Sequence, residues 1–195
     1  MELHMNGQQP SSQTSAQADR SIQPLALILL LALAAVLFFV GLGSLGLTDR
    51  DEGRNAEAGR EMYETGNYIS PTFNYEPRFA KPVFIYWLMS LSYHVFGVSE
   101  FAARFPSAIF GVGLILLQYL FLTRCRGPVV GLFGAAMLLL NLEIIGLSRM
   151  ALTDSVLSFF TTSSRYGFWR GLYGEGRARH YLWFFYIGMA LATLT

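Results

Sequence analysis

Long apolar runs separated by short charged segments are the feature that most constrains how this chain can fold. The runs at 24–47, 107–123 and 129–147 are nearly free of charged side chains, and a helix that spans a bilayer needs about 20 predominantly apolar residues. Of the 195 residues, 53% are hydrophobic and only 14% are charged, a composition typical of integral membrane proteins. We therefore expect an all-α integral membrane protein.

The runs divide the chain into a tail, a set of spans and one long loop. Residues 1–23 are rich in Ser, Gln and Ala, so we expect a disordered cytoplasmic tail. A transmembrane domain over 24–195 follows, with an outer loop at 48–106. The expected spans lie at about 24–47, 107–123, 129–147, 154–169 and 181–195. The chain stops inside the last run, so we expect that span to be incomplete and the chain to be the amino-terminal portion of a larger protein.

The apolar run at 83–96 decides which polar segments share a side of the membrane. At about 1.5 Å per residue it reaches roughly 21 Å, which is short of a hydrocarbon core of about 30 Å. It also contains Tyr86 and Trp87, and these residue types favour the headgroup zone. We therefore expect an interfacial helix here, which leaves the loop 48–106 and Asp154 on the same side.

The arginines of the short loops predict the orientation. Loops 124–128 and 165–180 are basic, and short basic loops stay in the cytoplasm. The amino terminus is then cytoplasmic, and the loop 48–106 faces outward. A cleaved signal peptide is the alternative for 24–47, but this run is long for such a peptide and begins after a long polar tail.

A concentration of charge follows the first apolar run directly, at 51–62. Asp49 with Glu52 three residues later fits the pattern of a capping box. Gly66 suits the left-handed residue that ends many helices. These signals predict a helix from about 50 to 65.

On such a helix Asp51, Arg54 and Asn55 share one face. A carboxylate beside a guanidinium suits an acid/base group next to a phosphate clamp. The helix dipole also favours the anionic form of a carboxylate in the first turn. The alternative is a solvated helix whose charges pair at i,i+4 spacing.

Two further charged positions are site candidates. Asp154 opens a helix after 149–153, where it is either a second acidic group of the site or a helix N-cap, and Arg149 can balance its charge. Lys81 precedes Pro82 at the start of the interfacial run, where an ammonium group can hold a lipid phosphate or anchor the helix. No His, Cys and Glu cluster has the spacing of a metal site, and no basic block points to nucleic acid.

Several spaced motifs together resemble the amino-terminal part of a family of C-type bacterial membrane glycosyltransferases. That family transfers 4-amino-4-deoxy-L-arabinose from undecaprenyl phosphate to lipid A, and is related to the protein O-mannosyltransferases. The motifs are Asp51-Glu52-Gly53-Arg54 through Glu61-Met62, Gly66, Lys81-Pro82, Tyr86-Trp87-Leu88, Phe96-Gly97, Ala103-Arg104, Pro106-Ser107 and Arg149-Met150-Ala151-Leu152-Thr153-Asp154. The resemblance covers about residues 24–195.

The resemblance implies a multi-helix transmembrane bundle of C-type glycosyltransferase fold in the bacterial inner membrane, surrounded by membrane lipids, with interfacial juxtamembrane helices in the first outer loop. The site would lie on the periplasmic face. The donor would be an undecaprenyl-phosphate-linked sugar, used without a nucleotide cofactor, and the acceptor a lipid A-like lipid or a protein. Asp51 and Asp154 would be catalytic, and Arg54 and Lys81 would contact the donor phosphate; Glu52, Asn55 and Arg149 are secondary candidates. Transfer would invert the sugar carbon, and residues 1–195 alone are expected to be inactive.

Two positions depart from the family pattern. The family has Glu immediately before the Lys-Pro pair, an acid tied to metal binding, whereas this chain has Ala80, and Glu76 is nearby but out of register. This difference puts a divalent-metal requirement in doubt and leaves the metal ligands unknown. Asn55 stands where an aromatic residue is common. A lipid-linked sugar flippase or transporter and a non-catalytic paralogue stay open as alternatives.

Overall fold

The computed structural model describes residues 11–173 and 180–195, and for residues 11–23 it describes the backbone alone. The described part is helical apart from one small antiparallel hairpin, in which Thr72 pairs with Pro77 and Phe73 with Glu76. This agrees with the expected all-α class. The elements in chain order are α1 (Ser11–Phe39), α2 (Arg50–Thr65), β1 (Thr72–Phe73), β2 (Glu76–Pro77), α3 (Phe84–Phe96), α4 (Glu100–Arg126), α5 (Pro128–Leu139), α6 (Leu142–Ser148), α7 (Asp154–Tyr173) and α8 (Tyr181–Thr193).

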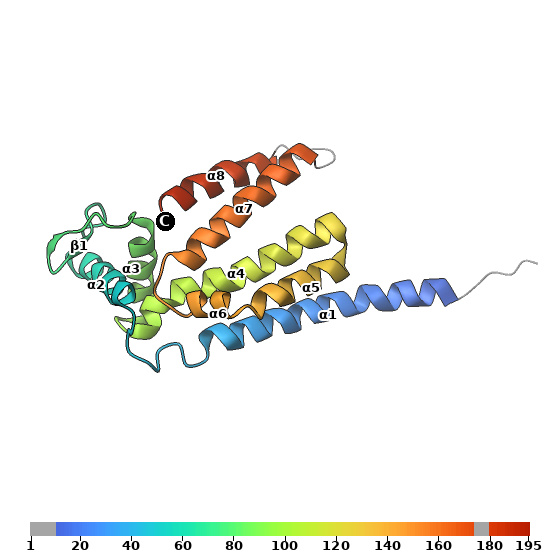
Figure 1. Cartoon of the computed structure of the whole chain (residues 1–195), viewed down its shortest axis with the longest axis horizontal. Coiled ribbons are helices and arrows are strands. Elements are labelled where there is room, and N and C mark those ends of the chain that lie inside the picture. Colours follow the sequence, from blue (N-terminus) through green and yellow to red (C-terminus); the bar gives the residue numbers. More distant parts are fainter. Residues whose placement is uncertain (1–10, 174–179) are drawn as a thin grey trace, which may run out of the picture.

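The long helices run along the long axis of the molecule, and α2, α3 and the hairpin gather at one end (Figure 1). Helix α4 is central, because it contacts α1, α5, α6 and α7. Helices α7 and α8 pack against each other as a pair. The carboxyl end of α1 and the first turns of α4 and α7 also lie at the α2–α3 end (Figure 1). Segments that are far apart in the sequence therefore meet there.

Helix α4 is long and apolar enough to cross a membrane, and it is the one continuous helix of that kind in the described ranges. Helices α5 and α6 pass the same test only as a pair, which bends by 67° at its break. The uninterrupted span expected at 129–147 is therefore corrected. The side chain of Asn141 accepts hydrogen bonds from the N–H groups of Glu143 (2.9 Å) and Ile144 (3.4 Å), so a polar cap starts a second helix inside the apolar run. The total number of spans stays a prediction.

Helix α1 differs from the expected first span at both ends. It begins at Ser11, so residues 11–23 of the expected disordered tail are helical, while 1–10 lie outside the described residues. It ends at Phe39 rather than near 47, and Gly41 follows with φ of +68°, a left-handed conformation that glycine adopts without strain. Residues 40–47 then run as turns and extended chain toward α2. The apolar part of α1, Pro24–Phe39, is shorter than the expected span.

Helix α2 confirms the helix predicted from its capping signals. The side chain of Asp49 accepts hydrogen bonds from the N–H groups of Asp51 (2.8 Å) and Glu52 (3.3 Å). At the other end Gly66 has φ of +67°, and its N–H group donates to the carbonyl of Met62 at 3.1 Å. The bounds are Arg50–Thr65, as the sequence predicts.

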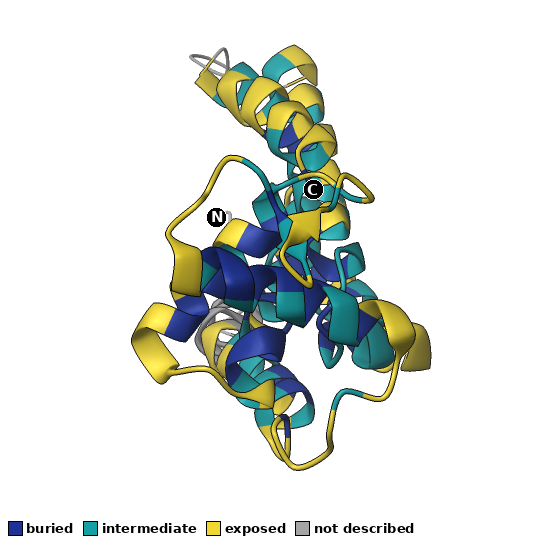
Figure 2. Cartoon of the chain, turned by 90° about the vertical axis from the view of Figure 1, so that its left-hand side faces the viewer, coloured by how far each residue is buried: buried dark blue, intermediate teal, exposed yellow. Residues whose placement is uncertain are grey.

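Helix α3 is a separate short helix that packs on α2 and α4, as expected for the run at 83–96. Its residues Tyr86 and Met89 are fully buried against α2. Figure 2 looks onto this end of the molecule, where buried turns lie centrally and exposed loops surround them. Gly59 of α2 allows the close approach, because a Cβ there would lie 2.9 Å from the Cβ of Met89. Whether α3 lies at a membrane surface stays a prediction.

Replacing Gly59 with Ala should destabilise the protein, because the added Cβ would collide with Met89. Overpacking of this kind costs about 1–3 kcal/mol, which exceeds the roughly 0.5–1 kcal/mol that Ala gains over Gly inside a helix. Thermal unfolding in detergent should show a lower Tm. Gly53→Ala is the matched control on the same helix, because a Cβ at Gly53 has nothing within 4 Å, and it should keep or raise the Tm. Equal changes in both variants would contradict the close contact.

Candidate functional site

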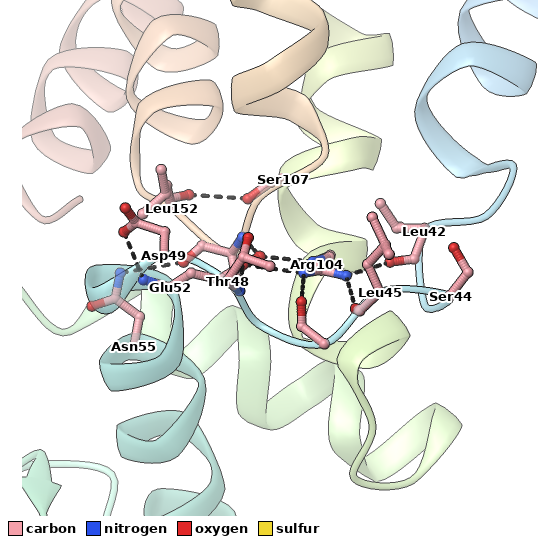
Figure 3. A network of polar contacts seen from close by, with 12 residues as sticks. Leu42, Ser44, Leu45, Thr48, Asp49, Glu52, Asn55, Arg104, Ser107 and Leu152 are labelled. Carbon is pink, nitrogen blue, oxygen red and sulfur yellow. Dashed lines mark hydrogen bonds and ion pairs between the residues drawn. The ribbon is translucent and has the colours of Figure 1, made fainter.

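A buried ion pair between Glu52 and Arg104 lies at the α2–α3 end of the molecule (Figure 3). The Arg104 Nε atom is 2.7 Å from Oε1 of Glu52, and Nη2 is 3.1 Å from Oε2. The side chain of Glu52 is 0% exposed and that of Arg104 is 6% exposed. A forked guanidinium matches a carboxylate with two parallel hydrogen bonds, which favours this geometry.

Arg104 also holds the chain that follows α1. Its Nη1 atom donates to the carbonyls of Leu42 (2.8 Å) and Leu45 (2.7 Å), and Nη2 donates to the carbonyl of Gly46 (2.9 Å). These carbonyls lie in the irregular chain after α1, so the guanidinium satisfies acceptors that no helix pairs. The sequence places Arg104 early in α4, after the N-cap Ser99.

Glu52 uses its remaining acceptor capacity on two backbone N–H groups. Oε1 accepts from Ala151 at 2.9 Å, and Oε2 accepts from Thr48 at 3.2 Å. Glu52 therefore does not close the expected capping box by reaching back to Asp49. Its position on the inward face of α2 directs the side chain toward Arg104 instead.

The loop 149–153 is held against α2 and α4 by side chains from three directions. The Asn55 Nδ2 group donates to the carbonyl of Ala151 at 3.2 Å, and Ser107 Oγ donates to the carbonyl of Leu152 at 3.0 Å. Arg149 donates to the carbonyls at the end of α1, which are those of Leu37 (2.6 Å) and Val40 (2.9 Å). This loop leads directly into Asp154, the first residue of α7.

Asp51 lies on the solvent side of the same end. Its side chain is 52% exposed, and Oδ2 lies 4.0 Å from Nζ of Lys81, whose side chain is 27% exposed. The separation is at the outer limit of an ion pair, and neither side chain is buried. Asp154 is half-buried, and its carboxylate makes no hydrogen bond or ion pair with the residues described. The expected N-cap hydrogen bond of Asp154 is therefore absent from that part of the chain.

The structure separates the expected Asp51–Arg54–Asn55 face. Asp51 is exposed and Arg54 is half-buried, whereas Asn55 is 0% exposed. Neighbouring positions on an α-helix lie about 100° apart, so the edge of the buried face runs between Arg54 and Asn55. The secondary candidates Glu52, Asn55 and Arg149 form hydrogen bonds with backbone groups of the protein.

Arg104 and Ser107 were not among the predicted site residues, although both lie in motifs of the sequence. The sequence offers one indication of their role: an arginine and a hydroxyl group lie near the start of a largely apolar helix. Polar groups that are buried in such a place need partners. Their backbone partners, which lie at 42–46 for Arg104 and at Leu152 for Ser107, can be identified only from the tertiary structure.

A metal site is not formed by the described residues. Among them, no three His, Cys, Asp or Glu side chains come close enough to hold an ion together. Ala80 contributes no ligand atom at the position where the resemblance expects Glu, and Glu76 lies in the hairpin. The described residues therefore do not by themselves supply three ligands for the metal that the family pattern implies.

Comparison with known proteins gives a consistent set of matches. The family profile described as dolichyl-phosphate-mannose-protein mannosyltransferase matches residues 25–194. An uncharacterized protein of Aquifex aeolicus is 37% identical over 142 residues, which is 72% of this chain and 34% of that protein. The undecaprenyl phosphate-alpha-4-amino-4-deoxy-L-arabinose arabinosyl transferase of Pseudomonas savastanoi is 33% identical over 157 residues, which is 80% of this chain and 29% of the relative.

Solved structures agree with these matches. The crystal structure of ArnT from Cupriavidus metallidurans, in the apo state and bound to undecaprenyl phosphate, matches with a TM-score of 0.82 and 27% identity. The match covers 86% of this chain and 32% of ArnT. The chain thus spans about a third of the length of the proteins it matches.

The pKa of Glu52 leads to a prediction about stability. Burial raises this pKa, but the hydrogen bonds from Arg104, Ala151 and Thr48 outweigh burial and hold the pKa below its usual 4.5. A carboxyl with a lowered folded-state pKa adds stability that is complete above its unfolded pKa and is lost as the pH falls through the folded value. The free energy of unfolding should therefore decline below about pH 4.5, as followed by chemical denaturation across pH.

Glu52→Gln should remove this part of the pH dependence. It should also cost about 3–5 kcal/mol at neutral pH, because Arg104 is left buried without its counter-charge. Glu64→Gln is the control, since Glu64 pairs with Arg60 at the surface and such pairs contribute little. A stability difference between parent and Glu52→Gln that stays constant from pH 7 to pH 3 would contradict this role.

Proposed function

Because the chain belongs to the dolichyl-phosphate-mannose-protein mannosyltransferase family, we propose that it is part of a membrane glycosyltransferase that takes a sugar from a polyprenyl-phosphate donor. The relatives named as arabinosyl transferases carry undecaprenyl phosphate in their names. ArnT has been crystallised with undecaprenyl phosphate bound. These matches support an undecaprenyl-phosphate-linked sugar as the donor.

The pairing of exposed Asp51 with Lys81 carries the proposal. Their side chains lie 4.0 Å apart on the solvent side of the buried Glu52–Arg104 network. A carboxylate can take a proton from an acceptor hydroxyl, and a neighbouring ammonium can stabilise a phosphate leaving group. One site then offers both groups that transfer from a phosphate-linked sugar needs.

The reaction is a single displacement at the anomeric carbon. An acceptor oxygen forms a bond to that carbon while the bond from the carbon to the phosphate oxygen breaks. The electron pair leaves with the polyprenyl phosphate, and the acceptor proton passes to Asp51. Attack from the side opposite the leaving group inverts the configuration of the carbon.

Each of the other predicted residues has a role in this scheme. Lys81 and Arg54 contact the donor phosphate, and electrostatic stabilisation of a leaving group is usually the largest catalytic term. Asp154 supplies the second carboxylate, at the start of α7. Glu52, Asn55 and Arg149 are positioning residues, since their hydrogen bonds hold the backbone next to Asp51 and Asp154.

The acceptor in this proposal is a lipid A-like lipid or a protein, reached at the periplasmic face of the bacterial inner membrane. The basic segments 124–128 and 165–180 support this orientation; the structure places 124–126 at the end of α4 and 165–173 at the end of α7, and residues 174–179 lie outside the described residues. Segment 124–128 covers the junction of α4 and α5, at the ends of these helices that lie away from α2 and α3 (Figure 1). With those basic loops in the cytoplasm, Asp51 and Asp154 face the periplasm together.

Asp51→Asn in the intact protein should reduce sugar transfer about 10²- to 10⁴-fold, because the amide cannot accept the acceptor proton. Transfer of radiolabelled sugar from the lipid-linked donor measures the effect. Asp49→Asn is a closely matched control, because Asn caps a helix as well as Asp, and it should leave transfer near the parent level. Normal transfer by Asp51→Asn would contradict the proposed role of Asp51 as the proton acceptor.

Asp154→Asn should also lower transfer while leaving the Tm of the protein nearly unchanged. A carboxylate in the first turn of a helix contributes only about 0.3–1 kcal/mol through the helix dipole. A loss of transfer without a loss of stability separates a role in the site from a role in starting α7. A variant with full transfer and a lowered Tm would assign Asp154 to the helix alone.

A further inference from the structure

A cleft of about 360 Å³ opens between α2 and the hairpin, next to the Asp51–Lys81 pair but lined by other residues. Its lining contains two arginines from separate elements, Arg54 of α2 and Arg78 just after β2, and one carboxylate, Glu76. The remaining lining residues are Phe73, Pro77, Phe79 and Ala80. The formal charge of the lining is therefore positive.

The two guanidinium groups have no counter-charge of their own. Neither Arg54 nor Arg78 forms an ion pair with any residue that the structure describes. The Nε atom of Arg78 is buried and has no hydrogen-bond partner in that part of the protein. A buried donor without a partner is unfavourable, so this atom can still donate to an acceptor that the described residues do not supply.

The guanidinium of Arg78 is held in place before any ligand arrives. It lies over the ring of Phe73, with Cζ 5.5 Å from the ring centroid, and the Arg78 N–H group donates to the carbonyl of Pro71 at 2.8 Å. Stacking on an aromatic face is a common way to orient arginine. Less side-chain entropy is then lost when the group binds an anion.

The hairpin that carries Arg78 is fixed to the helix that carries Arg54. Buried Glu61 accepts hydrogen bonds from Thr72 Oγ1 (2.5 Å) and from the N–H group of Tyr75 (3.2 Å). Glu61 lies two helical turns after Arg54, so both point to the same side of α2. The hairpin turn at Asn74–Tyr75 has φ of +55° and +62°, the left-handed values of a tight two-residue turn. The separation of the two arginines is therefore set by the fold.

We propose that this cleft is an anion site and that Arg54 and Arg78 together bind a phosphate group in it. Two forked guanidiniums present parallel N–H donors that match phosphate oxygens. The phosphate belongs either to the polyprenyl donor, in line with the contact proposed for Arg54, or to a phosphorylated acceptor lipid, in which case Lys81 alone holds the donor phosphate. Only this choice of source rests on the function proposed above.

Equilibrium binding to the purified, intact protein in detergent tests the site without any sugar transfer. One arm uses undecaprenyl phosphate, and the other compares lipid A with its dephosphorylated form. Arg78→Gln should weaken binding about ten-fold or more in at least one arm, because a hydrogen bond to a charged group is lost. A loss with undecaprenyl phosphate assigns the cleft to the donor. A loss confined to lipid A, and absent with its dephosphorylated form, assigns it to the acceptor.

Glu76→Gln provides a test with the opposite sign. Removing the only carboxylate of the lining should strengthen phosphate binding about three-fold, because a like charge no longer opposes the ligand. Misfolding would not produce tighter binding, so this variant decides the question if Arg78→Gln is unstable. Arg60→Gln is the matched control on α2, since Arg60 pairs with Glu57 and Glu64 instead.

Several results would overturn the site. They are unchanged affinity of Arg78→Gln in both arms, an equal loss with dephosphorylated lipid A, weaker binding by Glu76→Gln, or a loss of the same size in Arg60→Gln. Each leaves the glycosyltransferase proposal standing if Asp51→Asn still abolishes transfer. A protein that binds phosphate through Arg78 yet transfers no sugar would instead contradict the glycosyltransferase alone.

Discussion

The buried ion pair between Glu52 and Arg104 is the interaction on which the α2–α3 end of the structure depends. It joins α2 to α4, and each partner also binds backbone from a third segment, the chain after α1 for Arg104 and the loop before α7 for Glu52. A buried ion pair adds little net stability over an apolar replacement, because both charges lose their hydration. Removing one partner is costly, however, because the other charge then stays buried without a counter-charge. The pair therefore specifies one arrangement of four segments.

This arrangement separates charges that hold the fold from charges that can meet a ligand. Glu52, Arg104 and Asn55 are buried and bind protein groups. Asp51, one residue before Glu52, points outward to Lys81. The hydrogen-bonded layer behind the exposed groups holds the backbone that carries them, and a reacting site needs such support. The proposed anion cleft has the same organisation. Buried Glu61 binds the hairpin through hydrogen bonds, and Arg54 and Arg78 line the cleft.

Much of the fold follows from local patterns. The bounds of α2 come from Asp49 and Gly66, whose effects act within one helical turn. The separate helix α3 follows from the short length of the run at 83–96, and that inference also brings Asp51 and Asp154 to one end of the molecule. The length of the apolar run at 129–147 predicted one continuous helix, but the side chain of Asn141 caps a new helix within it. The length of the run at 24–47 likewise predicted helix through 40–47, but α1 ends at Phe39, just before Gly41.

The sequence by itself determined the helical class, the capped helix α2, the family and the charged residues that are proposed to bind a phosphate-linked sugar. These depend on composition, on spacing and on contacts between residues close in the chain. Only the tertiary structure decided that Glu52 and Asn55 face the interior, that Arg104 pairs with Glu52 and holds the chain after α1, that Ser107 supports the loop before Asp154, and that Arg54 and Arg78 line one cleft. The physical reason is that the sequence gives the identity of a charged residue but does not show whether its side chain is solvated or buried. Its role depends on partners that are about 50 or 100 positions away, as Arg104 and Ala151 are from Glu52.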